Sequence, residues 1–143
     1  MKPTGLTLPE LVVVMAITGA LLALGVPRLA SALDRVRVAR AATEVTTALA
    51  VARHGAVAWG VRSRLLIASD SLRIDTLGRV AWGAFRRLPG PAEHGVTLDV
   101  SNEVVQFGPS GIGWGVSNTR ITLHRGVHSE TITTSRLGRV KRW

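Results

Sequence analysis

A single carboxylate stands at the edge of the most apolar segment of this sequence. Glu10 immediately precedes residues 11–26, a run of sixteen residues without a charged side chain. An unpaired carboxylate at the centre of a bilayer costs about 2.5–3.5 kcal/mol or more, so an ionisable group in such a segment is a functional hypothesis by default. Glu10 is therefore the first candidate functional residue.

The C-terminus carries the second candidate site. Four basic side chains fall within eight residues, no acidic residue interrupts them, and the chain ends on an aromatic ring: Arg136, Arg139, Lys141, Arg142 and Trp143. Arginine and lysine on an exposed ribbon neutralise phosphates, and tryptophan stacks on bases. The tail is thus a candidate DNA-binding site, with a solvated strand as the simpler alternative.

The remaining polar residues form no catalytic constellation. His124 and His128 flank Gly126 and would face each other across a hairpin, with Glu130 as the nearby carboxylate. Exposed hairpin histidines explain this pattern better than a metal site. Other features are interpreted as isolated histidines, solvated aspartates and a flexible glycine loop: His54, His94, Asp70, Asp75 and residues 111–115. We predict no enzyme activity, no metal and no cofactor.

Length and composition limit the protein classes. The 143 residues suffice for one domain with an extension. The absence of cysteine excludes disulfides, thiolate zinc sites and cysteine nucleophiles. Eighteen basic residues, sixteen of them arginine, against nine acidic ones give a net charge of +9. This charge indicates either an acidic partner or simply an arginine-rich composition.

The apolar run is long enough to cross a membrane. Counted from Leu6, it extends over 21 residues, interrupted only by Thr7, Pro9 and Glu10. About twenty apolar residues at ~1.5 Å each span a ~30 Å hydrocarbon core. A cleaved secretory signal fits less well, because only Lys2 precedes the run and no small-residue cleavage site follows it.

The first 27 residues resemble the class III signal of type IV pilins and type II secretion pseudopilins. Gly5 and the following LTLPEL precede the apolar run, and Pro27 ends it at the spacing usual in that family. The resemblance implies cleavage by prepilin peptidase after Gly5 and N-methylation of Leu6. Leu6 replaces the commoner phenylalanine, and Pro9 stands where an aliphatic residue is more usual.

The same resemblance implies an assembly role for Glu10. Its carboxylate would pair with the free amine of Leu6 on a neighbouring subunit, so that two buried charges neutralise each other. The implied partners are other pilins, the peptidase and the inner membrane, with the C-terminal domain in the periplasm. Arg28, Arg35 and other arginines after the run favour the opposite orientation by charge, but this rule is weak for long translocated domains.

The apolar period predicts one long helix and then strands. Residues from Pro27 to Trp59 are alanine-rich and repeat apolar side chains at spacings of three and four, which predicts a continuation of the helix with one stripe packed on the protein's own sheet. The stripe is Val38, Ala42, Val45, Leu49, Ala52, Ala56 and Trp59. Pro27 is a candidate kink, and Arg40 and Glu44 form a candidate ion pair.

After Gly60 the pattern changes to short alternating runs separated by turn residues. We expect strands at 64–68, 72–75, 79–85, 96–100, 103–107, 120–124, 127–134 and 139–141, with loops at 89–91 and 108–115. A helix followed by antiparallel strands predicts an α+β fold, in which a long N-terminal helix, transmembrane in its first half, packs on a C-terminal antiparallel β-sheet domain.

The C-terminal half resembles the globular domain of GspH/FimT-type minor pseudopilins through FGPSG at 107–111, TRITL at 119–123 and ITTSRLGRV at 132–140. The implied organisation is a leader at 1–5, a transmembrane and assembly helix at 6–27, its periplasmic continuation at 28–59 and a globular domain at 60–143. The implied function is a structural subunit of a type II secretion pseudopilus or a type IV pilus. The alternative is a DNA-binding minor pilin of the FimT type, whose GRxR motif appears here as Gly138-Arg139-Val140-Lys141.

Overall fold

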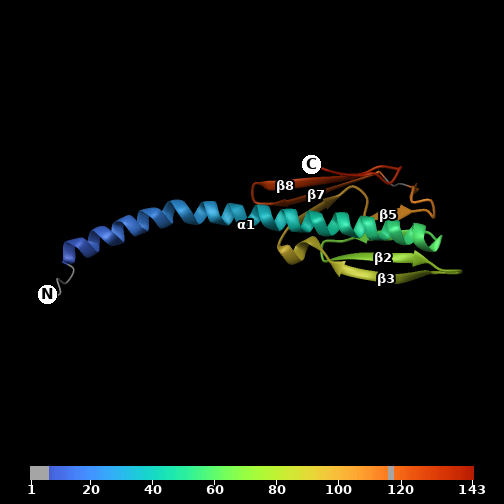
Figure 1. The fold of residues 1–143 in the computed structure, drawn as a ribbon, viewed down its shortest axis with the longest axis horizontal. Helices are drawn as coiled ribbons and strands as arrows, with labels where there is room; N and C mark the ends of the chain where they lie inside the picture. The colour runs from blue at the N-terminus through green and yellow to red at the C-terminus, as the bar shows by residue number, and fades with distance from the viewer. Residues whose placement is uncertain (1–6, 116–117) are drawn as a thin grey trace. The chain divides into compact units, whose positions relative to one another are not determined.

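The computed structural model describes residues 7–115 and 118–143. Within them, helix α1 (Leu8–Trp59) precedes the strands and one short 3-10 helix, η1 (Figure 1). The elements after α1 are β1 (Ser63–Ile67), β2 (Ser71–Leu77), β3 (Trp82–Pro89), η1 (Pro91–His94), β4 (Thr97–Val100), β5 (Val104–Phe107), β6 (Gly113–Trp114), β7 (Thr119–Arg125), β8 (His128–Thr134) and β9 (Val140–Arg142).

Helix α1 is 52 residues long and contains Pro27 in its interior. Proline has no backbone N–H to donate to the preceding turn, yet the residues on both sides remain helical. The helix ends at Trp59 and is followed by Gly60, whose φ of 62° is unfavourable for residues with a side chain. The N–H of Val61 donates to the carbonyl oxygen of Ala56 at 3.2 Å, and that of Gly60 to Val57 at 3.3 Å, which closes the last turn.

The chain divides into two compact units, one ending at Leu33 and one running from Asp34 to Trp143. In the first unit, the described residues are helical from Leu8 and their large apolar side chains are exposed. The second unit contains the rest of α1 and all the strands.

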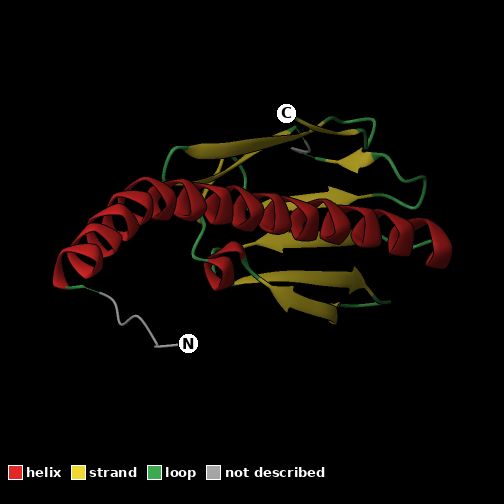
Figure 2. Cartoon of the chain, turned by 60° about the vertical axis from the view of Figure 1, so that its left-hand side comes forward, coloured by secondary structure: helices red, strands yellow, loops and turns green. Residues whose placement is uncertain are grey.

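The strands of the second unit form two antiparallel sheets. One has the order β3-β2-β1-β5-β6 and the other the order β4-β7-β8-β9. Figure 2 shows the part of α1 that belongs to this unit lying over the strands and running in roughly the same direction. The predicted α+β fold, with a long helix packed on antiparallel sheets, is confirmed.

The core lies between this part of α1 and the sheets. Val38, Val45 and Leu49 of the helix are buried in one cluster with Phe107 of β5 and Ile121 of β7. The predicted apolar stripe is buried from Val38 to Ala56. Its last member is the exception: Trp59 is 52% exposed, and its ring meets Phe85 edge-on at the end of the helix.

Three parts of the predicted strand and loop pattern differ from the structure by more than a shift of one or two residues. The strand expected at 79–85 begins at Trp82 and ends at Pro89, because Gly78 donates to the carbonyl oxygen of Ala81 at 2.9 Å and residues 78–81 form the turn. The short strand β6 lies within the loop expected at 108–115. Of the loop expected at 89–91, only Gly90 lies between β3 and helix η1, which begins at Pro91; the proline supplies a fixed φ at the first turn.

Candidate functional site

Glu10 lies in the first turn of α1 and caps it. The N–H and the hydroxyl of Thr7 both donate to Oε2 of Glu10 at 2.9 Å. This is one half of a capping box, in which a carboxylate three residues into the helix satisfies a backbone donor that precedes it. The Thr7-x-x-Glu10 spacing is the sequence signal that would have predicted this contact. Gly5 and Leu6, the predicted processing residues, lie outside the described residues.

The helix that follows Glu10 presents apolar side chains to its surroundings. An 18-residue window of α1 near the N-terminus has a mean hydropathy of 2.1, and none of that window is buried. Leu11, Ile17 and Leu24 are each more than half exposed. By length and composition this segment fits a single-pass membrane anchor.

The tail residues predicted to bind DNA do not share one face. Strand β9 pairs antiparallel with β8, so that Arg142 lies opposite Ile132 and Lys141 opposite Thr133. Successive side chains of a strand point to opposite faces. Arg142 consequently points with the core side of the sheet towards α1, whereas Lys141 lies on the other face. There its Nζ is 3.4 Å from the ring centroid of Trp143.

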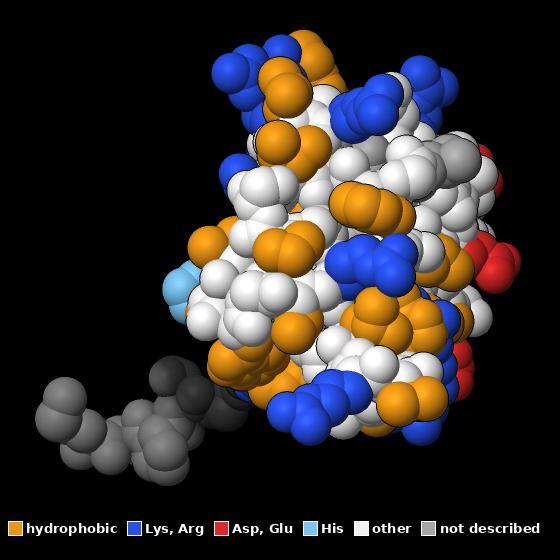
Figure 3. Space-filling view, turned by 90° about the vertical axis from the view of Figure 1, so that its right-hand side faces the viewer, with side chains coloured by type: hydrophobic (Ala, Val, Ile, Leu, Met, Phe, Trp, Pro, Cys, Tyr) orange, Lys and Arg blue, Asp and Glu red, His pale blue; other side chains and the backbone are white. Residues whose placement is uncertain are grey.

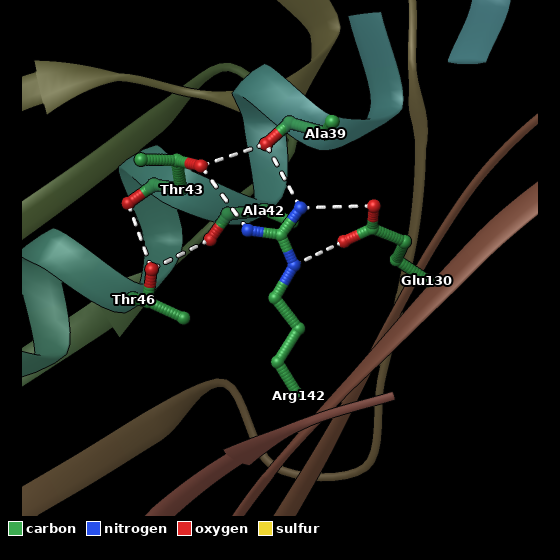
Figure 4. A network of polar contacts seen from close by, with 6 residues as sticks. All are labelled: Ala39, Ala42, Thr43, Thr46, Glu130 and Arg142. Atoms are coloured by element: carbon green, nitrogen blue, oxygen red, sulfur yellow. Dashed lines mark hydrogen bonds and ion pairs between the residues drawn. The ribbon is translucent and has the colours of Figure 1, made fainter. Parts of the chain in front are cut away.

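Arg142 joins the last strand to the helix (Figure 4). Its guanidinium forms a two-pronged ion pair with the carboxylate of Glu130 and donates to Oγ1 of Thr43 at 3.2 Å. The bonded Glu130 carboxylate raises the pKa of Arg142 further above its usual range. Arginine is charged at every physiological pH, and all three guanidinium nitrogens of Arg142 donate to partners within the domain.

The other two tail arginines lie near the turn that precedes β9. Arg136 and Arg139 are exposed, and the turn between them is held by Arg53 of α1, whose Nη1 donates to the carbonyl oxygen of Gly138 at 3.0 Å. An open cavity of ≈ 450 Å³ beside this contact is lined by Leu49, Ala50, Arg53, His54, Val57, Gly138, Arg139 and Val140.

His94 and the two hairpin histidines are arranged differently from the prediction. His94 is not isolated: its Nε2 lies 2.9 Å and 3.0 Å from the two carboxylate oxygens of Glu44. Glu44, expected to pair with Arg40, is thus the partner of His94. In the hairpin, His128 lies opposite Arg125, and His124 opposite Ser129. Within the described residues, no group of three possible ligands comes together to hold a metal ion.

Asp75 was expected in solvent, but it is only 2% exposed. Arg64 and Arg73 cover its carboxylate, at 2.8 Å and 3.1 Å. Asp70, by contrast, has a side chain that is 72% exposed, as expected. Strand pairing explains why Asp75 is buried, because Arg64 is its cross-strand partner and covers its carboxylate.

Comparison with known proteins identifies the fold. The structure is similar to that of the type IV minor pilin FimU of Pseudomonas aeruginosa, solved in two crystal forms. In space group P21 the TM-score is 0.64 at 18% sequence identity, covering 76% of this chain and 89% of FimU. In space group P65 the TM-score is 0.61 at 17% identity, covering 73% and 90%.

The fold is that of a pilin. No family model matches the sequence, and no curated protein matches it. The likeness to FimU therefore lies in the arrangement of helix and sheets, which persists at an identity too low to indicate the role of individual residues.

Proposed function

We propose that this protein is a minor subunit of a filament of the type IV pilus or type II secretion class. The observation that supports this most directly is that the two parts of α1 differ in what their apolar side chains contact. Its first part exposes an apolar surface that only a bilayer or other helices would cover, and its second part forms the core of a pilin-fold domain. Such a subunit is held in the inner membrane by residues 6–27, with its folded domain in the periplasm, before it joins the filament.

Within this proposal, prepilin peptidase cleaves after Gly5 and the new amino group of Leu6 is methylated. That amine lies four residues from Glu10, so the carboxylate of one subunit and the amine of its neighbour can compensate each other in an apolar filament core. In the separate subunit, the Thr7 cap satisfies the same carboxylate. Assembly then exchanges a local hydrogen bond for an intersubunit ion pair, which sets the register between helices.

The finer assignment is a GspH/FimT-type minor pseudopilin. Its support is the sequence resemblance at 107–111, 119–123 and 132–140, together with the pilin fold of the domain. The genes that neighbour this one distinguish a secretion operon from a pilus cluster.

Two substitutions at one position test the role of Glu10. Glu10→Gln retains a side chain that accepts the Thr7 bonds but removes the charge, whereas Glu10→Val removes both. Both proteins should fractionate with the inner membrane, and neither should enter sheared filaments. Normal incorporation of Glu10→Gln would reduce the role of the residue to helix capping and remove the proposed ion pair.

Mass spectrometry of the native protein tests the processing step. In a host with the peptidase, the expected N-terminus is methylated Leu6. A protein that retains Met1 to Gly5 with an unmodified Leu6 would contradict the filament-subunit function.

DNA binding by the basic tail stays a prediction, as the alternative function. Because Arg142 is engaged by Glu130 and Thr43, the cations left to meet phosphates are Arg136, Arg139 and Lys141. Gel shifts over a salt series decide the matter: binding that weakens steeply with salt and falls in the Arg139→Ala, Lys141→Ala double variant supports it. The absence of a shift at low salt eliminates it.

A further inference from the structure

One end of the second unit exposes aromatic and aliphatic side chains from four separate segments (Figure 3). The last turn of α1, strand β3, the loop after β5 together with strand β6, and the turn before β9 contribute to it. We call this surface the end face and define its apolar part as Trp59, Phe85, Ile112, Trp114 and Leu137, each between 44% and 70% exposed.

Specific contacts join these segments into one surface. The rings of Trp59 and Phe85 meet edge-on, with 4.7 Å between their centroids. The guanidinium of Arg62 lies 5.1 Å from the ring centroid of Trp114. The N–H of Gly113 donates to the carbonyl oxygen of Arg136 at 2.7 Å, so strand β6, which carries Trp114, is bound to the turn that carries Leu137. These exposed side chains therefore stand on a backbone that is held in place.

The charged side chains that belong to the end face are basic. Arg62 and Arg136 belong to it, and neither contacts a carboxylate among residues 7–115 and 118–143. Figure 3 shows arginine and lysine side chains interspersed with apolar ones, while acidic side chains appear only at one margin of the view. Tryptophan and arginine are the residue types that most often dominate binding at protein interfaces.

We propose that the end face is the docking surface for a second, non-identical filament subunit that presents apolar side chains among carboxylates. The inference rests on the proposed function and names one partner of the subunit. A second copy of this chain carries the same net charge of +9, and a symmetric contact would bring the same arginines face to face, which is repulsive. The five apolar side chains against two arginines argue for protein over nucleic acid, because interfaces with nucleic acid are more polar and much more positively charged than interfaces between proteins.

Site-specific cross-linking of the full-length protein in its native host tests the proposal. The chain has no cysteine, so Leu137→Cys gives a single attachment point for a thiol-reactive benzophenone. Ile17→Cys, in the exposed apolar part of α1, reports helix-mediated assembly, and Val127→Cys is a comparison residue of similar chemistry that is 89% exposed in the β7–β8 turn.

The expected product at position 137 joins this chain to a different pilin-like subunit, through a peptide with net negative charge. Val127→Cys should not yield that product. In the Leu137→Cys background, Arg136→Glu should lower its yield at least about fivefold, because it replaces attraction by repulsion. Arg120→Glu, an equal change of charge at an exposed position on β7, should leave the yield unchanged.

The proposal is overturned if position 137 cross-links to a second copy of this chain or to DNA, or if Val127→Cys gives the same product in equal yield. It is also overturned if Ile17→Cys gives pilin cross-links and Leu137→Cys gives none, an outcome that leaves the proposed function intact. Failure of both positions contradicts the proposed function itself and, with it, this inference.

Discussion

Arg64 donates from Nε and Nη2 to one carboxylate oxygen of Asp75, at 2.9 Å and 2.8 Å. The same guanidinium lies over the ring of Trp82, 4.5 Å from its centroid. The contact crosses from β1 to β2 on the face opposite Leu65 and Ile74, which belong to the core. A polar cluster on one face of the sheet thus accompanies the apolar core on the other.

A fragment of residues 31–143 should fold without the apolar helix and should be soluble and monomeric. Every residue of the buried core cluster lies at or beyond Val38, so truncation removes none of them, while it removes the exposed apolar run of α1. Circular dichroism and light scattering check folding and mass. Micelle-sized assemblies or an unfolded spectrum would show that the membrane segment is needed for the fold.

The Asp75→Asn variant of this fragment should lose about 1–3 kcal/mol of unfolding free energy. The substitution leaves two arginines without their shared counter-charge, a loss moderated because the side chains of Arg64 and Arg73 are 25% and 47% exposed. Denaturant titration of tryptophan fluorescence measures it. Asp70→Asn is the matched control: its side chain is 72% exposed and 3.6 Å from Arg87, so its effect should stay below about 0.5 kcal/mol. Equal effects would refute the distinction between the two aspartates.

The burial of Asp75 is a property that could not be predicted from the sequence. The alternation of apolar residues located β2, because Leu72 and Ile74 face the core and leave a local signal. Whether the next polar residue is buried depends on its cross-strand neighbours, and register is a non-local property. His94 was misjudged for the same reason, since its partner Glu44 lies fifty positions away on α1.

The long helix was predictable because its signals are local. An apolar stripe at helical spacing identified six of the nine buried residues from Val38 to Ala56 and missed Ala41, Ala48 and Gly55. It failed at Trp59, where the helix extends to the end of the sheet and the ring meets Phe85 instead of the core. The charge of the tail was visible in sequence, but the alternation of β9 that turns Arg142 inward required the pairing with β8.

The Gly138→Ala variant should be destabilised by about 2–3 kcal/mol. Gly138 has a φ of 71°, and a Cβ there would lie 2.6 Å from the carbonyl oxygen of Gly111. Both the left-handed backbone and the contact with a fixed backbone atom are unfavourable for alanine. The same denaturant titration gives the change.

Gly83→Ala is the control for this prediction, because the nearest atom to its added Cβ is 4.0 Å away and its φ lies outside the left-handed region. It should change stability by less than about 0.5 kcal/mol. If Gly138→Ala unfolds at the same denaturant concentration as Gly83→Ala, the close packing of the turn on the 108–115 loop is wrong.

Arg142 and Glu130 should show a coupling free energy of about 0.5–1 kcal/mol in a double-mutant cycle of Arg142→Met and Glu130→Gln. The side chains are 37% and 22% exposed, so solvent screens the pair, but two parallel bonds fix its geometry. The coupling should diminish as salt is added. Lys141→Met, on the other face of β9, should alter stability by less than about 0.3 kcal/mol.

Because Arg142 variants loosen β9, a loss of DNA binding in them would not identify a phosphate contact, whereas the same loss in Arg139 or Lys141 variants would. A coupling of zero would place Arg142 in solvent and return it to the set of available cations.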